Sequence, residues 1–429
     1  MHIKFSSYVI MDTAGSSLDP LGIQSSFSSM TSKIFPQFTV LSNYPRYHIV
    51  LCAIIDYIQK RADARQFALI FREYENLWGI AQTVRSTEDT DALAPVNVTK
   101  YKPVIEELGS HISFGAVSRK NYPTLFQRLG YGALGFYLAP SKRWGLVSDK
   151  RIPENTPIGK QLGDLLLNDF RVLFDMWRDG KNISFTSNLF KIFGEKTAIN
   201  PEFSRVPKNE KSVWKDILEL FIQKQSPSSF YKNLWDYLPS MEYIASVLSD
   251  QETYGSFFPT MIDIYSDNDK VTAFLDYCNH FEQFTTAFEF LFELEYALIQ
   301  NSEFFSEEAL LEIKEEVFAH LKGAAPFLLK DTVYLKRGLQ KVLEDFQNCK
   351  SWEKGFVVMT KRHMDVQGGK KKRPFFDESH SLFQLNQVPF NRVKNAVETF
   401  EESGFKGVRH AYRRDWHFMR AARYKEFIS

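Results

Sequence analysis

Basic side chains near the end of the sequence are its most concentrated chemical feature. Glycines Gly368 and Gly369 directly precede a run of lysines. Glycine leaves backbone N–H groups open to an anion, and a lysine or arginine that meets a phosphate releases counterions. The spacing therefore predicts a segment that binds nucleic-acid phosphates. Its six basic residues, all within thirteen positions, are Lys361, Arg362, Lys370, Lys371, Lys372 and Arg373.

A second basic group follows and is interleaved with aromatic residues. Arginine and aromatic side chains together can hold a nucleic-acid backbone and stack on its bases. We expect this group to support the lysine-rich segment on DNA. The alternatives are a solvated loop, or a basic face that docks onto an acidic segment of this chain or of a partner. The arginines are Arg409, Arg413, Arg414, Arg420 and Arg423, and the aromatic residues are Tyr412, Trp416, Phe418 and Tyr424.

Histidines and carboxylates near the lysines could in principle hold a metal ion. They occur as His363-Met364-Asp365 and as Asp377-Glu378-Ser379-His380. A metal-dependent nuclease that uses them is the rival interpretation. Glu312-Ile313-Lys314 matches the carboxylate–lysine part of a nuclease motif, but its acidic helical surroundings favour a solvated helix face. We assign no catalytic residue, metal or cofactor, because the sequence has no GxxxxGK[ST] loop, no GxGxxG loop after a strand and no serine elbow.

The segment 99–170 has the order of elements of a winged helix. Helical patterns are followed by a short strand at Trp144–Val147, a basic turn, and a helix that starts at Thr156 and Pro157, a side-chain N-cap with proline in the first turn. The glycines at 130, 132 and 135 would let helices approach closely or let the backbone kink. The candidate wing carries Lys142, Arg143, Lys150 and Arg151, which suit either DNA or a protein partner.

Helical periodicity dominates the rest of the chain. Apolar residues recur at i, i+3, i+4 and i+7 over 67–81, and 47–57 is apolar on several sides, so we expect two packed helices. Residues 213–346 indicate nearly continuous helix with breaks at Ser226-Pro227, Pro239-Ser240 and Gly323, and with a row of core aromatic residues over 274–298. The run 355–359 is β-like.

Composition excludes several classes of protein. The chain has 429 residues, a formal charge of +1 and 44% hydrophobic residues, which is typical of a globular protein and not of a disordered one. The three cysteines lie far apart and predict neither a zinc site nor a disulfide framework. The richest apolar run, 287–299, is broken by Glu289, Glu293 and Glu295, so we expect no membrane span. A soluble, cytoplasmic protein is expected.

Charge separates along the chain and supports a division into regions. Residues 280–350 carry a net charge of −6 and residues 351–429 a net charge of +7. The expected fold is mainly α and multi-domain, with a winged-helix-like module and a small α+β C-terminal region. The expected regions are a helical one over 1–98, the winged-helix-like module over 99–170, an aromatic-rich helical domain over 171–350 and the basic α+β region over 351–429.

Short patterns in the first part of the chain resemble a family. Residues 11–165 resemble a group of largely uncharacterised bacterial proteins encoded beside restriction and antiviral-defence genes. The resemblance implies a multi-gene defence setting and carries over no catalytic residue. The patterns that carry it are Met11-Asp12-Thr13-Ala14-Gly15, Asp19-Pro20-Leu21-Gly22, Ile34-Phe35-Pro36, Asn43-Tyr44-Pro45-Arg46-Tyr47, Gly132-Ala133-Leu134-Gly135-Phe136-Tyr137 and Thr156-Pro157-Ile158-Gly159.

These observations together predict a non-catalytic, DNA-associated or scaffold subunit of a bacterial antiviral-defence complex. Its expected partners are DNA and the products of neighbouring defence genes, such as an ATPase or a nuclease. Two alternatives stay open: a metal-dependent nuclease effector of such a system, and a pure protein–protein adaptor.

Overall fold

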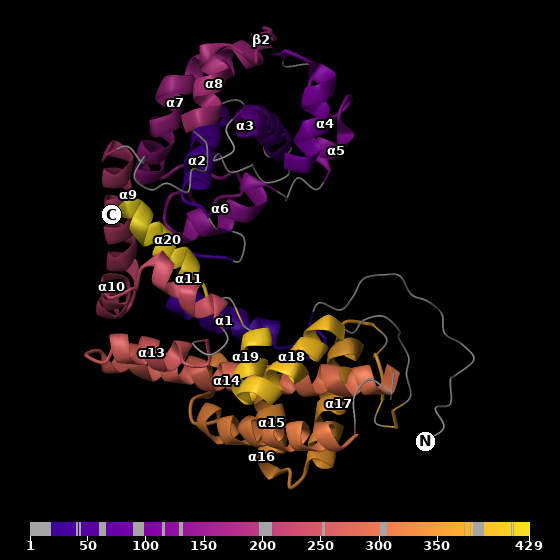
Figure 1. Cartoon of the computed structure of the whole chain (residues 1–429). Helices are drawn as coiled ribbons and strands as arrows, with labels where there is room; N and C mark the ends of the chain where they lie inside the picture. Colours follow the sequence, from indigo (N-terminus) through magenta and orange to yellow (C-terminus); the bar gives the residue numbers. More distant parts are fainter. Residues whose placement is uncertain are drawn as a thin grey trace. The chain divides into compact units, whose positions relative to one another are not determined.

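The computed structural model describes most of the chain. The described residues are 19–39, 42, 44–59, 66–88, 98–113, 116–127, 132–196, 208–250, 254–300, 307–372, 374–377, 379–380, 390–412, 414 and 416–429. Nearly all of their regular structure is helical (Figure 1). Arg373, Arg413, Glu378, the first shared pattern at 11–15 and Gly130 of the glycine-spaced stretch lie outside the described residues.

The chain forms two compact units that cut across the four regions expected from the sequence. Unit 1 is Met1–Ile34 with Glu242–Trp416, and unit 2 is Phe35–Met241 with His417–Ser429. The boundaries expected near 98, 170 and 350 therefore do not separate these units, because the chain passes from one unit to the other and back.

Unit 2 is built from helices around one buried helix. α2 is buried on nearly all sides, and it packs against α3, α6 and α7, which confirms the two helices and the packing expected from 47–57 and 67–81. The Tyr57 hydroxyl donates to Asp175 of α7 at 2.6 Å. The helices of unit 2 are α2 (Arg46–Ile58), α3 (Phe67–Glu88), α4 (Val98–Leu108), α5 (Pro123–Phe126), α6 (Ala133–Arg143), α7 (Pro157–Arg178), α8 (Asn188–Lys196), α9 (Lys208–Lys224), α10 (Ser228–Asp236) and α20 (Phe418–Ile428).

Two helix starts in unit 2 show why the sequence has its polar and glycine residues there. The Thr156 side chain accepts from the Gly159 N–H at the first turn of α7, with Pro157 in that turn, as predicted. At the start of α6, the Ala133 N–H donates to the buried Glu75 carboxylate. Gly132 has φ +116°, and a Cβ atom there would overlap the Glu75 carboxylate, so this position needs glycine.

The described strands do not make a winged helix. β1 (His111–Ile112) and β2 (Ile183–Ser184) pair antiparallel, with His111 opposite Ser184 and Ile112 opposite Ile183. The strand expected at Trp144–Val147 is reduced to a single bridge between Val147 and Asn155. The mainly helical class is therefore confirmed, and the winged-helix-like module is not.

Unit 1 is organised around the long aromatic helix α14, which packs along α15 and also contacts α13, α17, α18 and α19 (Figure 1). Most of the apolar side chains of α14 are buried, which confirms a core role for the aromatic row. The elements of unit 1 are α1 (Gln24–Ile34), α11 (Met241–Ser249, starting at the boundary), α13 (Phe257–Ile264), α14 (Asp269–Gln300), α15 (Glu307–Leu328), η2 (Thr332–Tyr334), α16 (Arg337–Asn348), α17 (Trp352–Gly369), α18 (Phe390–Ser403) and α19 (Phe405–Ala411).

Two expectations for unit 1 were wrong. The breaks expected at Ser226-Pro227 and Pro239-Ser240 are present in unit 2. In unit 1, however, Gly323 lies inside α15, where an exposed glycine only weakens a helix. The β-like run 355–359 lies inside α17. The burial of Phe356, Met359 and His363 follows the helical period, and Gly355 lets α17 approach the rings of Phe318 and Phe346. The described C-terminal region is thus helical rather than α+β.

Candidate basic surface and its acidic counterpart

Two arginines of the second basic group, Arg409 and Arg414, lie against a row of acids on α14. Arg409 is 5% exposed and pairs with Glu282 at 3.0 Å. It also donates to the Asn279 side chain at 3.0 Å and to the Gly255 carbonyl at 3.1 Å. The Glu282 carboxylate further accepts from the Tyr254 hydroxyl at 3.1 Å and from the Trp416 indole N–H at 2.6 Å. Arg409 therefore lies in the core and does not reach a phosphate.

The same arrangement continues along α14. Arg414 pairs with Glu289 at 2.7 Å, and its Nε donates to Thr285 at 3.2 Å. Four residues further on, Glu293 pairs with Arg392 and accepts from the Tyr412 hydroxyl at 2.6 Å. Burial raises the pKa of Glu293 to about 7, although Arg392 opposes the shift.

The row Glu282, Glu289 and Glu293 has the spacing of one helix face, and it neutralises basic residues that lie near the C-terminal end of unit 1. Of the sequence interpretations, the basic face docked onto an acidic segment of the same chain is the one that fits Arg409 and Arg414. The glutamates that interrupt the apolar run 287–299 are the sequence feature from which this intramolecular docking could have been predicted.

The last two arginines of the group belong to unit 2. Arg420 is 8% exposed and interacts with Nδ1 of His417 at 2.9 Å. The Arg423 guanidinium lies over the Tyr44 ring, 4.8 Å from its centre. The aromatic residues expected to stack on bases are all in the core, so they contribute packing instead: Tyr412, Trp416, Phe418 and Tyr424.

The first basic segment is divided between anchoring and exposed residues. The Arg362 Nε donates to the Leu21 carbonyl at 2.9 Å, and the Lys370 ammonium donates to the Asp19 carbonyl, so both hold the end of α17 against the turn before α1. Lys361, Lys371 and Lys372 are exposed, and Lys371 adopts a left-handed backbone with φ +56°. Lys371 and Lys372 are thus exposed just beyond the end of α17, and their contact with nucleic acid stays a prediction.

Both ring nitrogens of His363 form hydrogen bonds within the protein. Its Nδ1–H donates to the Pro20 carbonyl at 3.0 Å and its Nε2 accepts from the Phe375 N–H at 2.8 Å, which leaves neither ring nitrogen for a metal. His380 stacks on Phe356 with ring centres 4.8 Å apart. Among the described residues there is no group of three or more His, Cys, Asp or Glu side chains placed to hold a metal ion.

The burial of His363 has a consequence for stability. Loss of hydration lowers its pKa from 6.5 to about 4. The folded protein therefore favours the neutral ring, so the stabilisation is complete above pH 6.5 and is lost as the pH falls from 6.5 towards 4. We expect up to about 3 kcal/mol of the free energy of unfolding to disappear over that range.

Urea unfolding of the full chain between pH 4 and 7 tests this prediction. We expect the free energy of unfolding to depend less steeply on pH in His363→Gln than in the unsubstituted protein. An equal pH dependence of the free energy of unfolding in the two proteins would contradict the prediction. Burial also lowers the pKa of His48 in unit 2, to about 3. His48 therefore accounts for the pH dependence of stability that remains in the variant.

The other candidate residues also have local partners. Lys142 pairs with Asp149 at 3.5 Å, and Arg143 donates to the Pro36 and Phe38 carbonyls. Lys150 pairs with Glu154, and Arg151 is exposed. Lys314 of the nuclease-like tripeptide pairs with Glu295 and so ties α15 to α14. This use of Lys314 differs from the solvated face that we expected, since the side chain is 16% exposed.

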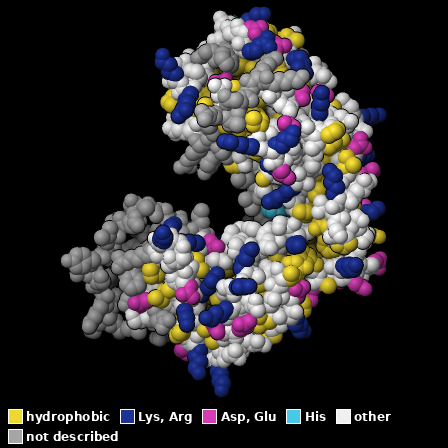
Figure 2. Space-filling model, turned by 180° about the vertical axis from the view of Figure 1, so that it is seen from behind, with side chains coloured by type: hydrophobic (Ala, Val, Ile, Leu, Met, Phe, Trp, Pro, Cys, Tyr) yellow, Lys and Arg dark blue, Asp and Glu magenta, His cyan; other side chains and the backbone are white. Residues whose placement is uncertain are grey.

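The surface shows no single large basic field on the face drawn in Figure 2. Lysine and arginine side chains are spread over it among acidic and apolar ones (Figure 2). No helix in the described part of the chain combines the length and apolarity needed to cross a bilayer.

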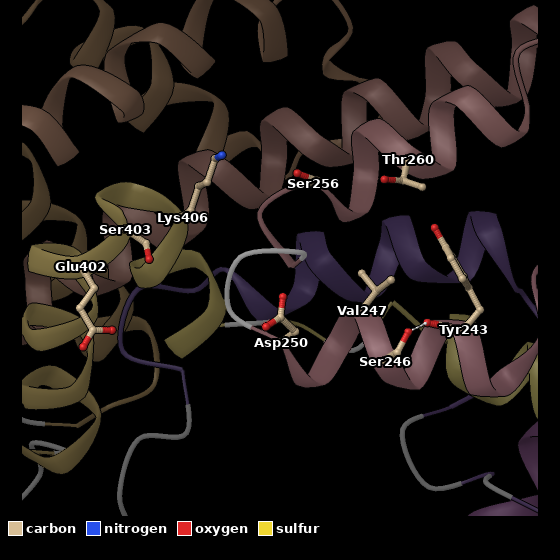
Figure 3. Close-up of a pocket in the computed structure, with 9 residues that line it drawn as sticks. All are labelled: Tyr243, Ser246, Val247, Asp250, Ser256, Thr260, Glu402, Ser403 and Lys406. Atoms are coloured by element: carbon tan, nitrogen blue, oxygen red, sulfur yellow. Dashed lines mark hydrogen bonds between the residues drawn. The ribbon is translucent and has the colours of Figure 1, made fainter.

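A groove in unit 1 was not anticipated from the sequence. It has a volume of about 820 Å³ and lies between α11, α13 and the junction of α18 with α19 (Figure 3). Glu402, Ser403 and Lys406 line one side, and Ser256 and Thr260 of the α13 region line another. Gly255 leaves room for the stem of Lys406, because a Cβ atom there would lie 2.8 Å from its Cγ. Side chains of both charges line the groove, so it does not select one sign of ligand.

Comparisons with known proteins found no relatives. No family model matches the chain, and no curated protein and no solved structure is significantly similar to it.

Proposed function

We propose that the protein is a non-catalytic, DNA-associated subunit of a bacterial antiviral-defence complex, and that it meets DNA phosphates through Lys371 and Lys372. The main observation in support is that these residues are exposed at the tip of α17, on a backbone held in place by Arg362, His363 and the turn at Asp19–Gly22. The defence setting is supported by the short sequence patterns of residues 11–165.

The anchored backbone matters for this function. A lysine on a fixed turn loses less conformational freedom when it binds than one on a loose loop. The sequence-independent part of the affinity comes from the phosphates that the cluster neutralises, so binding weakens as salt is raised.

Charge reversal of the cluster is the direct test. We expect Lys371→Glu/Lys372→Glu to weaken binding to a fluorescent duplex by at least about tenfold and to reduce the slope of log affinity against log salt by about 2, because two phosphate contacts are lost. Fluorescence anisotropy across a salt series measures both quantities.

The matched control is Lys100→Glu/Lys102→Glu, which makes the same change of charge at two exposed positions of α4 in unit 2. It should leave the slope unchanged. If both double variants lose affinity equally, the effect is one of net charge and the cluster at the tip of α17 is not the binding site.

A further inference from the structure

The groove between α11, α13 and the junction of α18 with α19 is lined mainly by hydroxyl groups (Figure 3). Tyr243 extends from α11 toward α13, which carries Thr260, and Lys406 extends from α19 toward Ser256 (Figure 3). The volume of about 820 Å³ is in the range of sites for small molecules. Five of the nine lining residues, all in unit 1, carry a hydroxyl: Tyr243, Ser246, Ser256, Thr260 and Ser403.

The hydroxyls of Ser256 and Thr260 are not used by the fold. A threonine inside a helix commonly donates to a carbonyl of the preceding turn. Thr31 and Thr285 do so at 3.1 and 2.9 Å. Ser256 precedes α13 without capping it, and neither its hydroxyl nor that of Thr260 has a hydrogen-bond partner among the described residues. Both hydroxyls are therefore available to a ligand in the groove.

The charged side chains of the groove disfavour a charged ligand. Asp250 and Glu402 supply carboxylates, and Lys406 supplies an ammonium group. Within the described part of the chain, the side chains of Glu402 and Lys406 form no ion pair or hydrogen bond. A phosphate or carboxylate would meet the two acids, and an amine would meet the lysine. An uncharged ligand that both donates and accepts hydrogen bonds satisfies all three groups.

We propose that this groove binds an uncharged saccharide. Neighbouring hydroxyls of a sugar ring can donate together to one carboxylate, such as that of Glu402, while the Lys406 ammonium donates to sugar oxygens. The hydroxyls of Ser256 and Thr260 both donate and accept. Tyr243 is 40% exposed, and its ring offers an apolar surface to the C–H face of a sugar.

This site goes beyond the DNA contact proposed for Lys371 and Lys372 and uses other residues, so the two are tested separately. The probes are four neutral disaccharides: maltose, cellobiose, lactose and N,N′-diacetylchitobiose. We expect saturation-transfer NMR with the full chain to show saturable binding of at least one of them, with a Kd of about 10 mM or tighter. The same sugar with a carboxylate or an amine in place of one primary hydroxyl should bind at least about fivefold more weakly.

Variants locate the site. Thr260→Val/Glu402→Gln removes a hydroxyl and a charge with little change of shape, and it should weaken binding about tenfold or more. Tyr243→Ala should weaken binding more than Tyr243→Phe, which keeps the ring. Circular dichroism should stay unchanged in these variants, because none of the three side chains is buried.

The matched control is Thr87→Val/Glu312→Gln, which makes the same two changes at exposed positions of α3 and α15. It should leave the affinity for the sugar within about twofold, and so should Lys371→Glu/Lys372→Glu. The proposal fails if none of the four disaccharides binds saturably, or if the control weakens binding as much as Thr260→Val/Glu402→Gln. It also fails if a charged derivative binds as tightly as the neutral sugar, because the groove then selects a different class of ligand.

Discussion

Replacing Arg409 with methionine should lower the stability of unit 1 by about 3–5 kcal/mol, because it leaves a buried carboxylate without its cation. Glu282, which is fully buried, would keep only the Tyr254 hydroxyl and the Trp416 indole N–H as donors. The Gly255 carbonyl and Asn279 would lose a donor as well. The loss is therefore shared between α14, α19 and the turn before α13.

Hydrogen exchange of backbone amides measures this effect locally. We expect the amides of α14 to exchange much faster in Arg409→Met, whereas those of α2 in unit 2 serve as an internal reference. Arg337→Met removes an exposed arginine of α16 and should change the stability by less than about 0.5 kcal/mol. Equal effects of the two substitutions would show that the Arg409–Glu282 pair is not part of the core.

The second large effect is expected at Gly159, in the first turn of α7. A Cβ atom at this position would lie 1.9 Å from the Leu146 carbonyl oxygen, which is a backbone atom and cannot rotate away. That carbonyl also accepts from the Thr156 N–H at 2.9 Å. Gly159→Ala should therefore force α7 away from its N-terminal cap and cost about 3 kcal/mol or more.

Gly323→Ala is the matched control for Gly159→Ala. Gly323 is also inside a helix, but a Cβ atom there meets nothing within 4 Å. Alanine is the better helix former, so this change should raise the stability by about 0.5–1 kcal/mol. Calorimetry of both variants should give shifts of the unfolding temperature in opposite directions, and a drop for both would refute the argument from close packing.

Local pattern predicted much of the fold. The helices over 47–57 and 67–81, the Thr156 cap and the core role of the aromatic row all follow from periodicity and turn chemistry within about twenty residues. The run 355–359 shows the limit of that approach. Two adjacent valines favour a strand locally, but packing against Phe318 and Phe346 selects a helix.

The candidate site depended on contacts that are remote in sequence. Arg409 and Glu282 are 127 positions apart, and Arg362 and Leu21 are 341 positions apart. Charge counts correctly identified an acidic stretch and a basic stretch, but they do not reveal that the arginines face the acids. The exposed lysines at the end of α17 were identifiable from sequence because glycine and lysine clustering is local.

The interleaved course of the chain has a consequence for how the protein is made. Tyr424 of α20 completes the core around Phe38, Trp144 and Trp214, and its hydroxyl lies 3.1 Å from Nε2 of His48. All of these partners are translated at least about two hundred residues earlier. The aromatic core of unit 2 therefore lacks Tyr424 while unit 1 is being synthesised. This core is completed only after position 424 has left the ribosome.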